Sequence, residues 1–170
     1  RTALYAFLFA KKNNGKFILR IEDTDQERFV EGATEQIIRT LHLAGINYDE
    51  GPDIGGPYGP YRQSERGAIY AEHASMLIER GAAYTCFCDA ERLEALRQRQ
   101  REHKLNPGYD GHCRTLTAIE ARARTRDGVP YVVRLAVDKQ ASTKVQDRLR
   151  GEVFFENQQV DDQVLLKSDG

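Results

Sequence analysis

The hydrophobic pattern of the first half of the chain predicts helices around one strand. Apolar residues at helical spacing predict one helix over about residues 1–12 and another over about residues 31–44, which Gly45 ends. Between them, residues 17–21 are almost continuously apolar and predict a strand buried on both faces, as in parallel sheets. This order of helix, strand and helix indicates an α/β fold.

A change of pattern follows the next loop. Residues 51–60 contain too much Gly and Pro for a regular element, and a third helix capped by Ser64 is expected after them. From about residue 83 the chain is predicted to alternate short strands with basic helices, the first of them capped by Asp89 and the second starting at the capping-box pattern Thr117 to Glu120. Strands are expected at residues 84–88, 131–137, 153–155 and 164–166. A domain boundary is therefore predicted near residues 82–86.

Composition narrows the function classes only a little. The 170 residues carry 25 basic and 26 acidic side chains, so the net charge of −1 provides no overall field to attract nucleic acid, and any such binding must use local patches. No apolar run approaches the roughly 20 residues of a membrane span, and no leader pattern is seen. We therefore expect a cytoplasmic protein.

The two ends indicate a piece of a longer protein. The chain starts at Arg1, without methionine, in what is predicted to be the middle of a helix. It closes on a strand-like run followed by a short turn. We expect an internal fragment whose partial sheet exposes apolar surface.

The predicted strand at residues 17–21 ends in polar side chains. Glu22, Asp23, Thr24 and Asp25 follow it directly. Because ligands of open α/β sheets bind outside the carboxyl ends of the strands, these residues are placed where a site is expected. The alternative is a polar turn after a core strand.

The cysteines suggest a metal site. Cys86 and Cys88 are one residue apart, and Cys113 follows in a turn that also holds Tyr109 and His112. Zinc takes four ligands, mostly thiolate and imidazole, so three cysteines leave one position for His112 or Tyr109. The odd number of cysteines disfavours a disulfide framework. The alternative is three reduced thiols, partly buried in a core.

Several long segments resemble one family in order and in spacing. The chain is similar, over essentially its whole length, to bacterial glutamyl-tRNA synthetases, which are class I aminoacyl-tRNA synthetases. The segments are Arg1-Thr2-Ala3-Leu4-Tyr5, Phe17 to Asp25, Asp49 to Asp53, Gly56 to Arg66, Tyr109-Asp110-Gly111 with Cys113-Arg114, Val132-Val133-Arg134, and Leu165 to Gly170.

The resemblance implies both a fold and a reaction. Residues 1–82 resemble the first half of a Rossmann-type nucleotide-binding domain, and residues 83–170 resemble its α+β insertion, which binds the tRNA acceptor end. The family activates L-glutamate with ATP and Mg²⁺ and transfers the glutamyl group to the 3′ end of tRNA-Glu. A full-length protein of this kind is expected to be a cytoplasmic monomer.

The resemblance also implies roles for individual residues. Glu22 resembles the acid that binds the α-ammonium of the substrate glutamate, a role that suits a carboxylate. Contact with tRNA is implied for Thr24, Asp25, Arg28, Lys167, Ser168 and Asp169. A structural Zn²⁺ is implied at Cys86, Cys88, Tyr109 and Cys113.

Two motifs of the family are absent from the sequence. The ATP-binding motif that contains histidine and the Lys-Met-Ser-Lys-Ser type of loop have no counterpart. Since both stabilise charge on the reacting phosphate, we expect the chain alone to be inactive and assign no catalytic residue. Two alternatives remain: the shorter paralogue that glutamylates queuosine in tRNA-Asp, and a zinc-stapled nucleic-acid-binding module.

Overall fold

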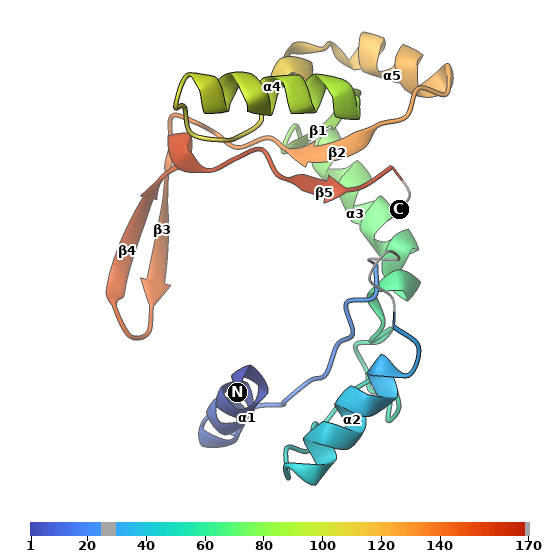
Figure 1. Ribbon diagram of the computed structural model, residues 1–170, viewed down its shortest axis with the longest axis vertical. Coiled ribbons are helices and arrows are strands. Elements are labelled where there is room, and N and C mark those ends of the chain that lie inside the picture. Colours follow the sequence, from blue (N-terminus) through green and yellow to red (C-terminus); the bar gives the residue numbers. More distant parts are fainter. Residues whose placement is uncertain (25–29, 169–170) are drawn as a thin grey trace. The chain divides into compact units, whose positions relative to one another are not determined.

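The chain forms two compact units. The computed structural model describes residues 1–24 and 30–168, and it divides into Arg1–Ile69 and Tyr70–Gly170. The division falls inside the helix α3 (Gly67–Glu79), whereas the sequence predicts a domain boundary just after this helix (Figure 1). The assignment of residues 1–82 and 83–170 to two domains therefore stays a prediction.

In its described residues, the first unit holds two α-helices before α3. They are α1 (Thr2–Lys12) and α2 (Ala33–Leu43), and a short 3-10 helix, η2 (Gln63–Arg66), leads into α3. Both α-helices fall within the predicted ranges, and Gly45 follows α2 in the left-handed conformation with φ of 68°. Among the described residues, no helix has the length and apolar character needed to cross a bilayer.

A small core joins α1, α2 and the predicted strand at residues 17–21. Its buried residues are Ala10, Phe17, Ile46 and Tyr48, with half-buried apolar side chains of α1 and α2 packed against them. The Phe7 and Phe17 rings meet edge to face at 5.8 Å. Only part of the apolar face of α1 is buried in this core, because Leu4 and Leu8 remain exposed.

Residues 17–21 are extended, but the prediction of a strand buried on both faces is wrong. The backbone N–H of Leu19 donates to Glu50, and that of Ile21 donates to Tyr61, so two isolated parallel bridges form. The parallel direction agrees with the prediction. Among the described residues, the segment pairs first with one partner and then with the other, and no continuous sheet forms on either side of it. Ile18 is therefore 43% exposed.

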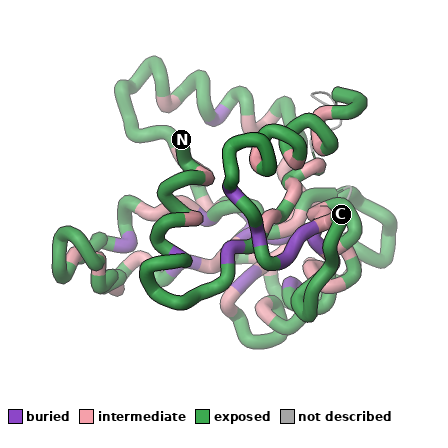
Figure 2. The backbone as a smooth tube through the Cα atoms, turned by 90° about the horizontal axis from the view of Figure 1, so that it is seen from below, coloured by how far each residue is buried: buried purple, intermediate pink, exposed green. Residues whose placement is uncertain are grey.

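Exposed residues predominate along the backbone (Figure 2). In the first unit they include large apolar side chains on helices, such as Phe9 on α1 and Leu43, which is 83% exposed, on α2. This agrees with the predicted exposure of apolar surface.

The Gly/Pro loop is built tightly around a buried acid. Glu50 accepts a 2.5 Å hydrogen bond from the hydroxyl of Tyr61, and both residues are buried. Gly56 has φ of 146°, and a Cβ atom there would lie 2.3 Å from the Tyr61 hydroxyl oxygen. The loop therefore requires glycine at this position.

The second unit is organised on a three-stranded antiparallel sheet. The strands are ordered β1 (Ala83–Cys86), β2 (Val132–Leu135) and β5 (Val164–Leu166), with Tyr84 opposite Arg134 and Cys86 opposite Val132 (Figure 1). A small core beneath it contains Ala74, Ala83 and Val133. All three strands lie within or next to predicted ranges.

Two helices follow their predicted caps. Asp89 accepts a hydrogen bond from the backbone N–H of Arg92 at the start of α4 (Ala90–Glu102), and Thr117 with Glu120 forms a complete capping box at the start of α5 (Ala118–Arg126). The predicted cap at Ser64 is wrong. The backbone N–H of Ser64 is itself bound by the carboxylate of Asp23.

One strand was not expected from the sequence. β3 (Ser142–Asp147) pairs with β4 (Gly151–Glu156) in a separate hairpin, and only β4 had been predicted. Since almost every residue of β3 is exposed, its sequence lacks the alternation of a half-buried strand.

Candidate metal centre and strand exit

Three thiols of the second unit converge on one point. Cys86 ends β1, Cys88 follows it, and Cys113 lies in the short helix η3 (His112–Thr115). Their sulfur atoms all lie within 4.8 Å of one another, and Cys88 Sγ is 3.6 Å from Cys113 Sγ. Thiolates bound to one zinc ion at about 2.3 Å lie about 3.8 Å apart in a tetrahedron, so the arrangement fits such an ion.

Tyr109 supplies the fourth polar atom. Its hydroxyl oxygen is 3.3 Å from Cys86 Sγ and 3.4 Å from Cys88 Sγ, and it accepts a 2.9 Å hydrogen bond from the backbone N–H of Cys113. His112, the alternative ligand, is exposed and is not part of the cluster. Of the two candidates, the turn thus brings Tyr109 to the sulfurs.

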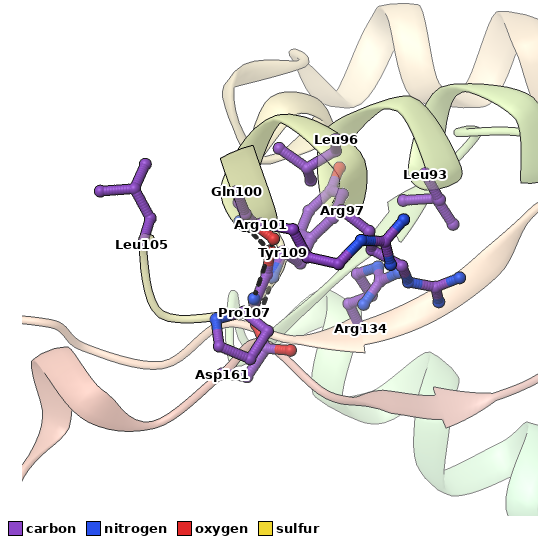
Figure 3. A pocket seen from close by; sticks show the side chains of 11 residues that line it. Leu93, Leu96, Arg97, Gln100, Arg101, Leu105, Pro107, Tyr109, Arg134 and Asp161 are labelled. Atoms are coloured by element: carbon purple, nitrogen blue, oxygen red, sulfur yellow. Dashed lines mark hydrogen bonds between the residues drawn. The ribbon is translucent and has the colours of Figure 1, made fainter. Parts of the chain in front are cut away.

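The loop that carries Tyr109 is clamped on two sides (Figure 3). The side chain of Gln100 on α4 donates to the carbonyl of Gly108 at 2.8 Å, and Asp161 accepts from the backbone N–H of Tyr109 at 2.9 Å. These residues also line a cavity of about 540 Å³ next to α4. The clamps hold the backbone of the loop at Gly108 and Tyr109.

Two arginines flank the cluster. The guanidinium of Arg134 lies 4.0 Å from the centroid of the Tyr109 ring, and Arg92 is held by a 2.6 Å ion pair with Asp110. The side chain of each arginine has one buried N–H group without an acceptor among the described residues, Nε of Arg134 and Nη1 of Arg92. Such orphaned donors are rare and fit a site that is completed by negative charge.

The thiols differ in their electrostatic surroundings. Burial raises the pKa of Cys86, but hydrogen bonds with Tyr109, the Cys88 backbone and Arg134 outweigh it and lower the pKa below its ordinary value. At Cys88, burial dominates and raises the pKa to about 11. Burial and the neighbouring thiols also raise the pKa of Tyr109. Of these two thiols, Cys86 is thus the better prepared to be a thiolate.

A buried acid supports the sheet below the cluster. Asp162, which is 2% exposed, accepts from the hydroxyl of Tyr84 at 2.8 Å and pairs with Lys139 and Arg114 at 3.3 Å each. Its backbone carbonyl accepts a 2.9 Å hydrogen bond from Arg134. Sequence reasoning assigned no role to Asp162, Arg92 or Arg134; the one signal was an arginine within the apolar run Val132 to Val137.

The acids after residues 17–21 have two different surroundings. Asp23 accepts hydrogen bonds from the backbone and the hydroxyl of Ser64, whereas Glu22 is exposed and pairs only loosely with Arg20 at 3.3 Å. Thr24 is exposed as well. The structure therefore brings Asp23 into the framework and leaves Glu22 accessible.

The remaining predicted tRNA-binding residues are only partly described. Lys167 and Ser168 are exposed directly after β5. Asp25, Arg28 and Asp169 lie outside the described residues.

Comparison with known proteins places this fold in a class. The chain superposes on a crystal structure of a glutamate tRNA ligase from Elizabethkingia meningosepticum in complex with its amino acid, with a TM-score of 0.88 and 37% identity over 99% of this chain and 35% of that one. A glutamate-tRNA synthetase from Elizabethkingia anophelis gives a TM-score of 0.89 at the same identity. The fold is thus that of an α/β, Rossmann-like catalytic region.

Sequence comparison identifies the family. A family model of class I tRNA synthetases (E and Q), catalytic domain, matches residues 1–170, and the chain belongs to this family. It is 55% identical over 168 residues to the glutamate–tRNA ligase of Fusobacterium nucleatum and 51% identical over 170 residues to that of Clostridium novyi. These matches cover 99% and 100% of this chain but 33% and 34% of the relatives, so the chain spans about a third of their length. The resemblance seen in the sequence is confirmed.

Proposed function

We propose that this chain is part of a glutamate–tRNA ligase, and that it contributes the contact with the substrate's α-ammonium group and contacts with the tRNA acceptor end. The observation that carries this proposal is the identity of 55% with a glutamate–tRNA ligase over nearly the whole chain. The superposition on a ligase in complex with its amino acid supports it.

Glutamate recognition is assigned to Glu22. In the reaction, the α-carboxylate of glutamate attacks the α-phosphorus of ATP and pyrophosphate leaves; the 3′ adenosine hydroxyl of tRNA then attacks the acyl carbon and AMP leaves. Glu22 takes no part in either bond change. Its exposed carboxylate binds the ammonium group and orients the substrate, while the bonds between Asp23 and Ser64 hold the adjoining backbone.

ATP and Mg²⁺ are substrate and cofactor of the activation step. No residue of the chain is assigned to them. Because the chain spans about a third of its relatives, the 170 residues alone are expected to show no glutamate-dependent ATP–pyrophosphate exchange.

Contact with tRNA is proposed for residues of both units. Thr24 and Lys167 offer an exposed hydroxyl and an exposed ammonium, groups that suit ribose and phosphate, respectively. Ser168 adds a second hydroxyl. Asp25, Arg28 and Asp169 keep their proposed roles on the resemblance alone.

The metal is proposed to be structural. Cys86, Cys88, Cys113 and Tyr109 would hold Zn²⁺, which joins the end of β1 to the turn after α4 and so stabilises a unit with a small core. We place the protein in the cytoplasm, a reducing compartment that keeps such thiols free. The monomeric state stays a prediction.

A chimera tests the proposed function. The part of the Fusobacterium nucleatum ligase that matches this chain is replaced by the 170 residues, and aminoacylation is followed with radioactive glutamate. We expect charging of tRNA-Glu. A chimera that gives a native circular-dichroism spectrum but charges no tRNA-Glu would contradict the proposal, and transfer to queuosine of tRNA-Asp would favour the shorter paralogue.

A further inference from the structure

We infer that Arg92 and Arg134 form a pair of cationic supports that tune the thiol cluster for a divalent metal by neutralising the negative charge of its thiolates. The inference rests on the metal site proposed above and extends it beyond the ligands themselves. It assigns these arginines as positioning residues, which act on the metal through Tyr109 and the sulfurs.

Arg134 is positioned by the register of the sheet. It lies directly opposite Tyr84, and Cys86, two residues further along β1, faces the same side. Arg134 is only 7% exposed. Its Nη1 donates to the carbonyl of Asp162, and its guanidinium lies over the ring of Tyr109. These contacts leave Nε buried and without an acceptor among the described residues.

Arg92 approaches from α4. The cap at Asp89 fixes the first turn of this helix, and the ion pair with Asp110 holds the guanidinium beside the turn that carries Tyr109. Within the described part of the chain, Nη1 of Arg92 is also buried without an acceptor. Two independent elements, β2 and α4, therefore each place an arginine beside the turn that carries Tyr109, and one donor of each arginine is unpaired among the described residues.

The negative charge of a site that holds a metal ion would account for both unpaired donors. Three thiolates around a divalent ion leave one negative charge, and a phenolate from Tyr109 adds another. A buried excess of charge is unfavourable unless it is paired and hydrogen-bonded. Metal-bound sulfur accepts hydrogen bonds, and groups next to metal ligands commonly change metal affinity by 10- to 100-fold. In the thiol form, by contrast, the cluster gives the two arginines nothing to neutralise.

Metal titration tests the inference. The purified, reduced 170-residue chain is titrated with Co²⁺, and its Zn²⁺ affinity is measured by competition with a chromophoric chelator. The variants are Arg92→Gln and Arg134→Gln. The control is Arg97→Gln, which removes an exposed guanidinium of α4 whose ion pair, within the described part of the chain, is with Glu94. We expect at least a tenfold weaker affinity for each variant and no change for the control. The thiolate-to-Co²⁺ charge-transfer band should keep its intensity, because all three sulfurs remain.

The outcomes separate the two proposals. A wild-type chain that binds no Zn²⁺ would overturn both the metal site and this inference. Wild-type binding with both variants within twofold of it would overturn the inference alone. If Arg134→Gln fails to fold, as judged by circular dichroism, Arg134→Lys and the more exposed Arg92→Gln decide: the lysine variant should keep most of the affinity, and Arg92→Gln should still lose it.

Discussion

The carboxylate of Asp23 accepts hydrogen bonds from both the backbone N–H and the hydroxyl of Ser64, at 2.9 and 2.8 Å. The two residues are 41 positions apart, so these bonds tie the exit of the extended segment at residues 17–21 to the start of η2. Of two neighbouring acids, Asp23 is thus a structural anchor, whereas Glu22 is exposed.

Removing the anchor should destabilise the first unit. We expect Asp23→Ala to lower the free energy of unfolding by about 1 kcal/mol, as for loss of a helix cap, in urea titrations followed by circular dichroism. Ser64→Ala, which removes only the hydroxyl, should cost less. Glu22→Ala is the control and should change the free energy of unfolding little. Equal losses for Asp23→Ala and Glu22→Ala would show that the two acids do not differ structurally.

The same bonds predict a pH effect. Burial raises the pKa of Asp23, but the bonds from the Ser64 backbone and hydroxyl outweigh it and hold the pKa below its ordinary value. The contribution of Asp23 to stability is therefore complete at neutral pH and is lost as the pH falls below its ordinary pKa and through the lowered one. Urea titrations at pH 7 and pH 3 should show a smaller difference between wild type and Asp23→Ala at pH 3.

Substrate recognition should depend on the charge of Glu22. In the chimeric ligase, Glu22→Gln keeps the size of the side chain but loses the ionic hydrogen bond to the ammonium group, so glutamate-dependent ATP–pyrophosphate exchange should fall by about tenfold or more. Arg20→Gln, which removes the ion-pair partner of Glu22, is the matched control and should have a much smaller effect. An unchanged kcat/KM for glutamate in Glu22→Gln would exclude the role.

Gly56 in the Gly/Pro loop and Gly67 in α3 should respond oppositely to replacement by alanine. Gly56→Ala forces a Cβ against the Tyr61 hydroxyl and a φ unsuited to alanine, so we expect a loss of about 1–3 kcal/mol in the free energy of unfolding. Gly67→Ala, at the start of α3 with nothing within 4 Å, should be neutral or stabilising by up to about 1 kcal/mol. Equal urea midpoints for the two variants would refute the tight contact.

Local features of this fold could be predicted from the sequence, whereas long-range ones could not. The caps at Asp89 and Thr117 were predictable because donor and acceptor are three residues apart. The predicted cap at Ser64 failed because its backbone partner, Asp23, is distant in sequence. The exposed strand β3 was missed because its pairing with β4, rather than any buried face, determines it.

The candidate metal centre shows the same difference between local and long-range features. The chemistry of three cysteines was enough to propose a cluster, but the choice between Tyr109 and His112 depends on the turn and on the clamps at Gln100 and Asp161. No role could be assigned to Arg134 from the sequence, since its contacts follow from strand register and from Asp162, 28 residues away.

The buried Asp162 should be the most sensitive acid of the second unit. Burial raises its pKa, but the bonds from Tyr84, the Val137 backbone and Lys139 outweigh it and lower the pKa. Asp162→Asn leaves nearby cations without their charge partner, so we expect a loss of about 3 kcal/mol at pH 7. The exposed Asp127→Asn should change stability little.

Acid should reduce the difference in stability between wild type and Asp162→Asn. Because the pKa of Asp162 is lowered in the folded protein, its contribution is present at neutral pH and is lost as the pH falls below the ordinary value for aspartate. The difference in thermal stability between wild type and Asp162→Asn should therefore become smaller from pH 5 to pH 3 (about the upper part of the range over which such a contribution is lost). A difference that stays constant over this range would exclude the carboxylate charge as its cause.

A variant of Tyr109 tests whether this residue is a metal ligand or only a hydrogen-bonding neighbour of the thiols. If its oxygen completes the coordination, Tyr109→Phe should still bind one Co²⁺ per chain through three sulfurs, with weaker affinity and an altered visible d–d spectrum because water takes the fourth position. Cys113→Ser, which removes a sulfur, should weaken binding further and lower the charge-transfer band. Chelation of Zn²⁺ should lower the melting temperature of the wild type, since binding stabilises the folded state.

The number of protons released on metal binding gives an independent test of whether Tyr109 is a ligand. Burial raises the pKa of the Tyr109 hydroxyl, and its contacts with Cys86 and Cys88 raise it further, so the phenol is protonated at neutral pH and must lose its proton to bind as phenolate. Calorimetric titrations in buffers of different ionisation enthalpy should then show about one proton fewer released by Tyr109→Phe than by wild type at pH 7. Identical proton release and an identical d–d spectrum would mean that Tyr109 only orients the sulfurs, and that the fourth ligand of the ion comes from solvent.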